Sequence, residues 1–324
     1  MTDLAFIALD DLTVVGRGVS RPEDVAVGRD GRVFVSDASA AVTEILSNGT
    51  TRAIGKAGGE PNGINLTEDN TAVVIANFAS GVLQRCDLAT QDVSVLCDAV
   101  DGRVLRHSNY PILARDGSIY CSESSRSDDA MVAGVYGEAD GYVFRLPPGG
   151  PPEIVADGIV LPNGLALDAD EHFLYCCRTT YGDVVRFLIA EDGNLGPLEV
   201  YATFGDRQVW GEAAAQVAWA DRERTAANLD LAVIADWGFT DGCTFDAEGN
   251  LWVTLPTQNR VVAVTPDRQI VPIMHDPAGA LLRMPTNVSF GGPDGCDVYI
   301  GSIARRHVVR GRSPIPGLPL LAQR

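Results

Sequence analysis

Six oxygen-bearing side chains occupy the same place in a motif that recurs along the chain. They are Glu23, Asn62, Asn109, Asn163, Asp241 and Asn287. Carboxylate and amide oxygens are the ligands that a hard cation such as Ca²⁺ accepts, and the set contains no His or Cys for a softer metal. Taken singly, an Asn-Gly or Asp-Gly pair is typical of a turn. Six aligned copies instead favour an oxygen-rich cation site, provided that the fold brings them together.

The sequence around each of these residues predicts a β-hairpin. In LPNGLALDADEHFLYCC, which begins at Leu161, a polar residue is followed by alternating apolar residues, an Asp-rich turn and a second apolar run. Successive polar positions are 39, 47, 54, 78 and 46 residues apart, and most of these spacings are close to the length of one propeller blade. Further strand-like sequence follows most hairpins, so two hairpins would make one four-stranded blade.

We therefore predict an all-β fold in which residues 1–324 form a single domain, a six-bladed β-propeller. The segment AFIALDDLTVV, residues 5–15, has no hairpin before it and is expected to supply the outermost strand of the last blade, which closes the ring. In a propeller the first strands of all blades converge on the central channel. The six polar residues would then be neighbours at its mouth.

One long spacing contains a segment of different composition. Residues 209–232, VWGEAAAQVAWADRERTAANLDLA, are rich in Ala, Glu and Arg, which favours a helical insertion. A surface decoration, a lid over the channel and a subunit contact remain alternatives for this segment.

Charge and cysteine usage restrict the partners and the compartment. The chain has 25 Lys and Arg against 43 Asp and Glu, a formal charge of −18, which argues against nucleic acid or an anionic membrane as a partner. The seven cysteines mostly lie in apolar runs, as expected of buried free thiols in a reducing compartment. With no signal peptide or membrane span in the sequence, we expect a cytoplasmic location.

Several motifs give the chain a family resemblance. They are RPED at Arg21, SNY at Ser108, LPNGLALDADEHFLY at Leu161, TDGCTFDAEGNLWVT at Thr240 and PTNVSFGG at Pro285. Over nearly its whole length, and least across residues 195–238, the chain resembles the senescence marker protein, gluconolactonase and luciferin-regenerating enzyme family. The resemblance implies a six-bladed propeller with a divalent cation, often Ca²⁺, in its channel. The implied ligands are Glu23, Asn109, Asn163 and Asp241, although Tyr110 replaces the Asp that the family has after its Asn.

The resemblance also implies a reaction, the hydrolysis of a lactone or a related ester. A bound dication can polarise the carbonyl and acidify the attacking water, and Asp241 is the candidate catalytic base. Zn²⁺, Mn²⁺ and Mg²⁺ are alternatives to Ca²⁺ in such a site. Residues at comparable positions near the channel end are candidates for substrate binding: Asn109, Glu123, His107, Tyr110, Arg178 and Trp237.

Aromatic residues near the predicted mouth bear on the substrate. They are Tyr110, Trp237, Phe239 and Phe78, and they indicate a substrate less polar than a sugar acid. The sequence identifies neither that small molecule nor the oligomeric state.

Other functions on this fold stay open. YCSESS and LPNGLALDADEHFLY are also similar to segments of strictosidine synthase-like propellers, some of which form carbon–carbon bonds. A phosphotriesterase would need the same cation, and a propeller face can also serve as a noncatalytic small-molecule binding platform. A serine hydrolase is disfavoured because the sequence has no G-x-S-x-G motif.

Overall fold

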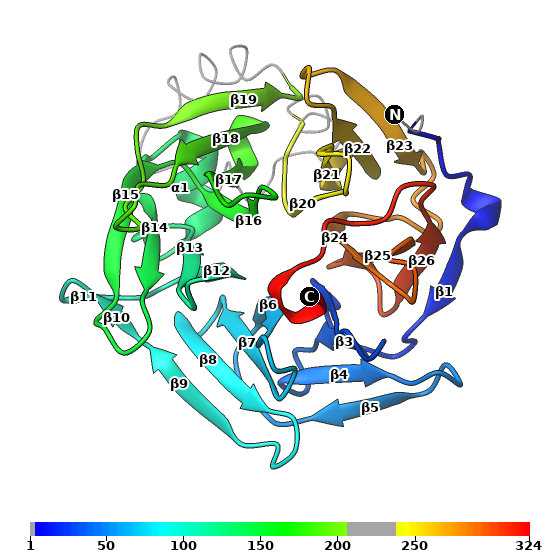
Figure 1. The fold of residues 1–324 in the computed structure, drawn as a ribbon, viewed down its shortest axis with the longest axis horizontal. Coiled ribbons are helices and arrows are strands. Elements are labelled where there is room, and N and C mark those ends of the chain that lie inside the picture. The colour runs from blue at the N-terminus through cyan, green and yellow to red at the C-terminus, as the bar shows by residue number, and fades with distance from the viewer. Residues whose placement is uncertain (1–3, 206–237) are drawn as a thin grey trace.

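The computed structural model describes residues 4–205 and 238–324. Within them, six four-stranded antiparallel sheets are arranged in a ring around a central channel (Figure 1), which confirms the predicted six-bladed β-propeller. The first three blades comprise β2 (Val25–Val27), β3 (Val33–Ser36), β4 (Val42–Ile45) and β5 (Thr51–Ile54); β6 (Pro61–Leu66), β7 (Ala72–Asn77), β8 (Val82–Asp87) and β9 (Val93–Cys97); and β12 (Ser108–Leu113), β13 (Ile119–Glu123), β14 (Gly141–Leu146) and β15 (Glu153–Ile159).

The remaining blades follow the same order from the channel outward. They comprise β16 (Pro162–Leu167), β17 (Phe173–Arg178), β18 (Asp183–Leu188) and β19 (Glu199–Thr203); β20 (Cys243–Phe245), β21 (Leu251–Leu255), β22 (Arg260–Val264) and β23 (Ile270–His275); and β24 (Pro285–Gly291), β25 (Asp297–Ser302), β26 (Val308–Arg312) and β1 (Thr13–Val15). A short hairpin, β10 (Ala99–Val100) and β11 (Arg103–Val104), lies between blades two and three.

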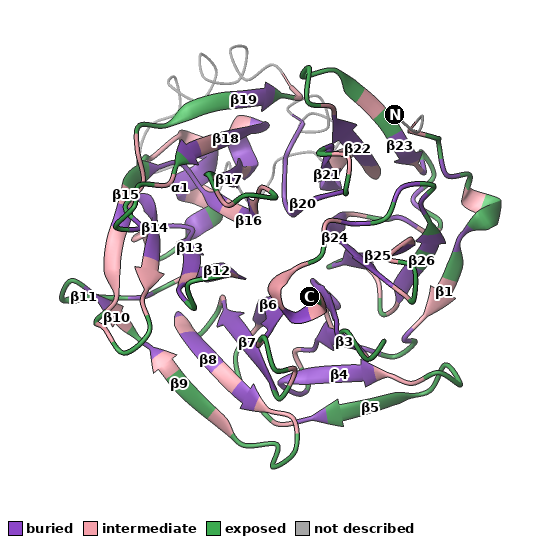
Figure 2. Cartoon of the chain, viewed as in Figure 1, coloured by how far each residue is buried: buried purple, intermediate pink, exposed green. Residues whose placement is uncertain are grey.

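Burial falls from the channel to the rim of each blade. Strands such as β6, β7, β24 and β25 are buried at every position, whereas outer strands such as β5 are largely exposed, as Figure 2 shows by its purple centre and green edge. The core lies between the faces of neighbouring blades. Trp252 of the fifth blade, for example, packs edge-on against Phe290 of the sixth, with 4.9 Å between ring centroids.

The ring is closed by a strand from the N-terminal segment, as predicted. Strand β1 pairs antiparallel with β26, and Val14 lies opposite Val309. The residues before β1 form a short 3-10 helix, Leu9–Asp11, and bury Ile7 and Leu12 between the fifth and sixth blades. Closure therefore depends on these apolar anchors as well as on strand pairing.

The C-terminal tail closes the channel at the end remote from the strand starts. Gly317 bridges Asp246 in the β20–β21 turn, and the carbonyl of Ala322 accepts a hydrogen bond from the Asn70 side chain in the β6–β7 turn. The tail ends in a 3-10 helix, Leu321–Gln323, near the centre of the ring (Figure 1). These turns lie at the far ends of the innermost strands, so the tail covers the side of the ring opposite the strand starts.

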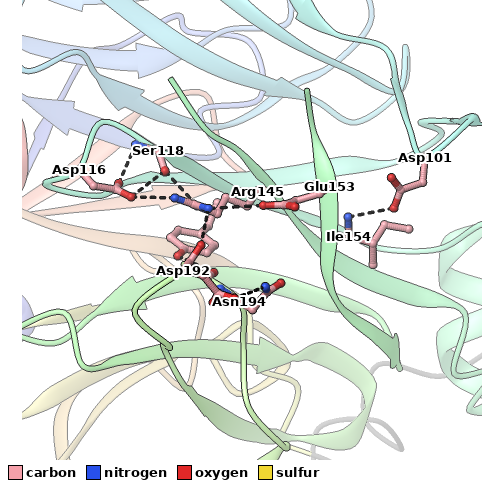
Figure 3. Close-up of polar contacts among 10 residues, drawn as sticks. Asp101, Asp116, Ser118, Arg145, Glu153, Ile154, Asp192 and Asn194 are labelled. Carbon is pink, nitrogen blue, oxygen red and sulfur yellow. Dashed lines mark hydrogen bonds and ion pairs between the residues drawn. The ribbon is translucent and has the colours of Figure 1, made fainter. Parts of the chain in front are cut away.

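A polar network joins blades three and four on this same far side (Figure 3). The Arg145 guanidinium donates to Asp116 at 2.9 Å, to Ser118 at 3.0 Å and to the carbonyl of Asp192 at 2.8 Å. Arg145 and Asp116 belong to blade three, whereas Asp192 lies in the β18–β19 connection of blade four. The network thus fixes the two blades relative to each other away from the channel mouth.

An element that the sequence did not predict covers part of the mouth. Helix α1 (Ala130–Tyr136) is inserted between β13 and β14, with the Asp129 carboxylate accepting a hydrogen bond from the Val132 amide as its N-cap and Gly137 ending it in a left-handed conformation. The carbonyl of Gly134 accepts a hydrogen bond from the Thr180 hydroxyl, which ties the helix to blade four.

The predicted helical insertion, residues 209–232, lies outside the described residues, as does Trp237. No helix among the described residues is long and apolar enough to cross a membrane.

We predict that the N-terminal anchor contributes measurably to ring closure. Leu12→Ala should lower the free energy of unfolding by about 2–3 kcal/mol, because it removes buried methyl groups from the junction of blades five and six. Phe6→Ala is the control, since Phe6 is exposed in the same segment and should change stability by less than about 0.5 kcal/mol. Urea unfolding of the two variants measures the difference, and equal effects would contradict an anchoring role.

Candidate functional site

The four predicted ligands line one cavity at the mouth of the channel. Glu23 and Asp241 stand just before β2 and β20, while Asn109 and Asn163 lie near the starts of β12 and β16. All four line the same cavity of about 420 Å³. The strand starts converge there because the innermost strand of every blade runs away from this mouth.

Glycine permits the close approach of neighbouring blades at these positions. A Cβ on Gly164 would lie 2.6 Å from the carbonyl oxygen of Asp241, closer than real side chains approach. The Gly164 amide instead donates a hydrogen bond to that same carbonyl at 3.0 Å. The Asn-Gly pair at Asn163 is therefore part of an inner strand pressed against the next blade, not a simple turn.

Glu23 and Asp241 are buried carboxylates whose mutual repulsion the nearby Arg21 guanidinium offsets only in part. Glu23 is 5% exposed and Asp241 9% exposed. Burial raises the pKa of Glu23, although the Arg21 guanidinium opposes the shift, and burial together with the neighbouring Glu23 raises the pKa of Asp241 well above its usual range. Arg21 lies 3.5 Å from Glu23 Oε2 without hydrogen-bond geometry. Among the described residues this buried oxygen has no hydrogen-bond partner.

The two asparagines are held by neighbouring hydroxyl groups. The Asn109 amide nitrogen donates to Ser124 at 3.0 Å, and the Asn163 amide nitrogen donates to Thr179 at 3.0 Å. Thr179 belongs to a 3-10 helix, Thr179–Tyr181, that follows β17. Because an amide has one oxygen and one nitrogen, fixing the nitrogen also fixes the direction of the oxygen, the atom that would bind a cation.

The other two members of the sequence motif have different surroundings. Asn62 lines the cavity, but its amide oxygen accepts a hydrogen bond from Arg21 at 2.9 Å and its nitrogen donates to Asn109. Asn287 lies beneath the cavity and donates to Asp24 and, at 3.3 Å, to the hydroxyl of Tyr110. Position in the repeat thus does not by itself put an oxygen in the cavity.

Some of the predicted substrate-binding residues line the cavity, and others do not. His107 and Asn109 line the cavity, and the His107 ring lies 5.0 Å from that of Phe78. Glu123 does not belong to the described lining. It is buried, and its carboxylate accepts hydrogen bonds from the backbone amides of Arg106 and His107, both at 2.6 Å, so it positions the loop that carries His107.

Tyr110 and Arg178 also lie outside the described lining of the cavity. Tyr110 is buried beneath the cavity, where its hydroxyl accepts a hydrogen bond from Asn287 of blade six, so it does not form part of a rim. Arg178 forms an ion pair with Asp183 at 2.5 Å and stacks over Tyr181 at 4.5 Å. Of the other aromatic residues that the sequence placed near the mouth, Phe78 lines the cavity, whereas Phe239 is buried and is not part of the lining.

Several lining residues were not identified from the sequence. Arg21 and Leu161 each precede a proline and have left-handed backbone, with φ of 54° and 41°. Such a conformation is rare for bulky residues, and an X-Pro step, which favours extended backbone, gave no signal of it. Residues Asp128 to Met131, at the start of α1, gave no signal either, because at the equivalent places of blades four and five the structure has short 3-10 helices and not an α-helix.

The donor set suits a hard cation. Two carboxylates and two amides supply oxygen only, one of the carboxylate oxygens is buried without a hydrogen-bond partner, and the two negative charges match a dication. Among the described residues, no group of three or more His, Cys, Asp or Glu side chains is arranged to hold a metal ion, so the candidate site depends on its amide oxygens as well as its carboxylates.

Comparison with known proteins decides the family. Residues 25–304 match the family described as SMP-30/Gluconolactonase/LRE-like region. The chain belongs to this family. A shorter segment, residues 7–40, also matches the description strictosidine synthase-like, N-terminal.

Individual relatives are distant. The chain is 29% identical to the protein strictosidine synthase-like 13 of Arabidopsis thaliana over 44% of this chain and 36% of that protein. It is 23% identical to a gluconolactonase of Zymomonas mobilis over 78% of this chain and 63% of the relative. The matches thus span less than two thirds of either relative. The fold is similar to that of a calcium-binding protein, regucalcin, from Agrobacterium tumefaciens, with a TM-score of 0.65, 16% identity, and 97% and 95% of the two chains covered.

We predict that Gly164 is required for the contact between blades four and five. Gly164→Ala should lower the free energy of unfolding by about 1–3 kcal/mol, because the added methyl group must displace the backbone of Asp241. Gly196→Ala is the matched control, since its Cβ would meet its nearest neighbours at an ordinary 3.5 Å. Urea unfolding that gives the same midpoint for both variants would show that the close approach is not needed.

Proposed function

We propose that this protein is a metal-dependent hydrolase that opens a lactone. The observation that carries the proposal is the convergence of Glu23, Asn109, Asn163 and Asp241 on one cavity, with a buried carboxylate oxygen that lacks a hydrogen-bond partner. Membership of a family that includes gluconolactonases supports the reaction class. The fold alone would not, since one fold serves many functions.

The same four residues would hold a divalent cation, and Ca²⁺ is the one we propose. Their oxygens suit a hard cation in flexible coordination, and a structural neighbour is described as calcium-binding. When bound, the cation would polarise the ester carbonyl and acidify the attacking water. Its charge would also compensate Glu23 and Asp241, which otherwise repel each other in a buried site.

The roles of the chain's own groups follow from their positions. The Asp241 carboxylate, held against blade four by the bond from the Gly164 amide to its carbonyl, would accept the proton of the attacking water. Asn109 and Asn163, fixed by Ser124 and Thr179, would orient the reacting group. Because the C-terminal tail covers the far end of the channel, substrate would enter and product leave through the same mouth.

A strictosidine synthase-like activity is the second candidate. The match of residues 7–40 to that N-terminal region favours it, and this segment includes Arg21 and Glu23 of the cavity. The two candidates differ in their need for a cation and in whether water is a reactant, so the test below separates them.

We also propose a cytoplasmic location and a small-molecule substrate. All seven cysteines are free thiols, and six of them are buried, which suits a reducing compartment.

Removal of the cation should abolish activity. We predict that lactone hydrolysis by wild-type protein is lost on exhaustive chelation and returns with added Ca²⁺. Glu23→Gln should weaken Ca²⁺ binding by about 100-fold or more, because it removes one of two charged ligands, and Asp241→Asn should leave no measurable turnover. Titration calorimetry and a pH-stat assay of lactone opening provide the measurements.

The control variant is Glu60→Gln. Glu60 lines the same cavity and forms an ion pair with Arg21 at 3.8 Å, but it is not among the proposed ligands. Its Ca²⁺ affinity should remain within a few-fold of wild type. Hydrolysis that survives complete removal of the metal would refute the proposed mechanism.

A further inference from the structure

The cavity has two chemically different regions. Its floor is polar and consists of Glu23, Asn109, Asn163 and Asp241 together with Asn62. Its walls carry apolar side chains from four separate places in the chain, namely Phe78, Ala130, Met131, Leu161 and Ile303.

Two of the apolar wall residues are open to solvent. Met131, in the first turn of α1, is 48% exposed, and Ile303, which follows β25, is 38% exposed. Large apolar side chains left exposed at the mouth of a cavity are typical of surfaces that a ligand covers. A plain polyhydroxy lactone would leave them in water.

The part of the apolar wall formed by Phe78, Ala130 and Leu161 is packed against neighbouring side chains. Leu161 packs with Ala130 and Val160 in a small buried cluster, against which Phe78 also packs. A Cβ on Gly134 would lie 2.7 Å from Leu161, so α1 sits directly on that side chain. Phe78, α1 and Leu161 come from consecutive blades, two, three and four, and form one continuous side of the mouth.

The charges around the mouth do not suit an anionic ligand. Glu60, Asp128 and Asp129 line the cavity in addition to the two carboxylates of the floor. Within the described lining, Arg21 is the only Arg or Lys, and its guanidinium already contacts Glu23, Glu60 and Asn62. Asp128 is paired with Arg106, so the charges that remain at the walls are those of Glu60 and Asp129. An anionic group on a substituent that lies against these walls would meet like charge, and within the described lining no Arg or Lys that is not already paired.

We propose that the substrate is an uncharged lactone with an apolar substituent. The lactone ring would lie over the polar floor, and the substituent would lie against Met131, Phe78 and Ile303. This inference rests on the proposed lactone hydrolysis and specifies its substrate class. It retains the less polar substrate that the sequence indicated, and of the aromatic residues named there it keeps Phe78, since Tyr110 and Phe239 are buried and do not line the cavity.

The test compares lactones that differ only in the substituent. Four δ-lactones are used. The first is unsubstituted, the second carries a hexyl group on the carbon beside the ring oxygen, and the third carries a carboxypentyl group there in place of the hexyl group. The fourth is glucono-δ-lactone. We expect kcat/KM for the hexyl lactone to exceed that for the unsubstituted lactone by about ten-fold or more. The carboxypentyl lactone and glucono-δ-lactone should fall below the hexyl compound by a similar factor. Equal or better turnover of either polar substrate would overturn the proposal.

Substitutions in the apolar wall test which side chains cause the preference for the hexyl lactone. Met131→Gln and Ile303→Gln replace exposed apolar side chains by an amide, so folding should be preserved. Each should reduce kcat/KM for the hexyl lactone by about ten-fold while changing that for the unsubstituted lactone by less than about two-fold. Leu188→Gln is the matched control, because Leu188 is 54% exposed at the end of β18 and is not part of the cavity lining. Equal losses on both substrates would contradict a role in specificity.

A binding measurement separates this inference from the proposed reaction. Hexyl-substituted and unsubstituted δ-lactams resist hydrolysis, and their affinities in the presence of Ca²⁺ can be compared by titration calorimetry. We expect the hexyl lactam to bind about ten-fold more tightly or better, and Met131→Gln to remove the difference. If no lactone is opened but this preference holds, the reaction is wrong and the apolar site stands. Equal affinities of the two lactams overturn the site even if lactones are hydrolysed.

Discussion

The close approach of neighbouring inner strands is the contact on which the rest of this structure depends. The Gly164 amide donates to the Asp241 carbonyl at 3.0 Å, the Gly242 amide to the Thr286 carbonyl at 2.7 Å, and the Thr286 hydroxyl to the Glu23 carbonyl at 2.7 Å. These bonds link blades four, five, six and one in sequence. Glycine is required at two of the donors because a side chain there would collide with the next blade. The backbones of Asp241 and Glu23 are thereby held by the neighbouring blades.

This arrangement explains how two carboxylates are kept in a buried place. Glu23 and Asp241 belong to different blades, and the ring of contacts prevents them from moving apart to relieve their repulsion. Beneath them a third buried carboxylate, Asp24, accepts hydrogen bonds from the Asn287 amide and from the backbone amides of Val25 and Ile64. If a cation binds as proposed, the ring of contacts that holds these two carboxylates together would contribute to its affinity.

Features that repeat in the sequence were predicted most completely. The hairpin period identified the six blades and the convergence of the aligned polar positions on the channel mouth, and the family resemblance singled out Glu23, Asn109, Asn163 and Asp241 among them. The closing strand followed from an N-terminal strand segment that has no hairpin before it. Glu123 was assigned to the pocket, yet it accepts backbone hydrogen bonds beside it. Which way a side chain near a strand end points depends on local bonding. Among the described residues the places equivalent to α1 hold at most short 3-10 helices, so the repeat gave no basis for predicting it.

The floor and the walls of the cavity lie on different kinds of structural element. The floor lies on inner strands, where interlocked backbones allow little variation, and relatives as different as a gluconolactonase and a strictosidine synthase-like protein match parts of the same chain. The walls lie on α1 and on the segments after β7 and β25, where insertions and substitutions do not disturb the ring. Changes in the walls of this protein would alter what the cavity accepts without disturbing the ring. The apolar surface of Met131 and Ile303 is therefore the feature that bears on its substrate.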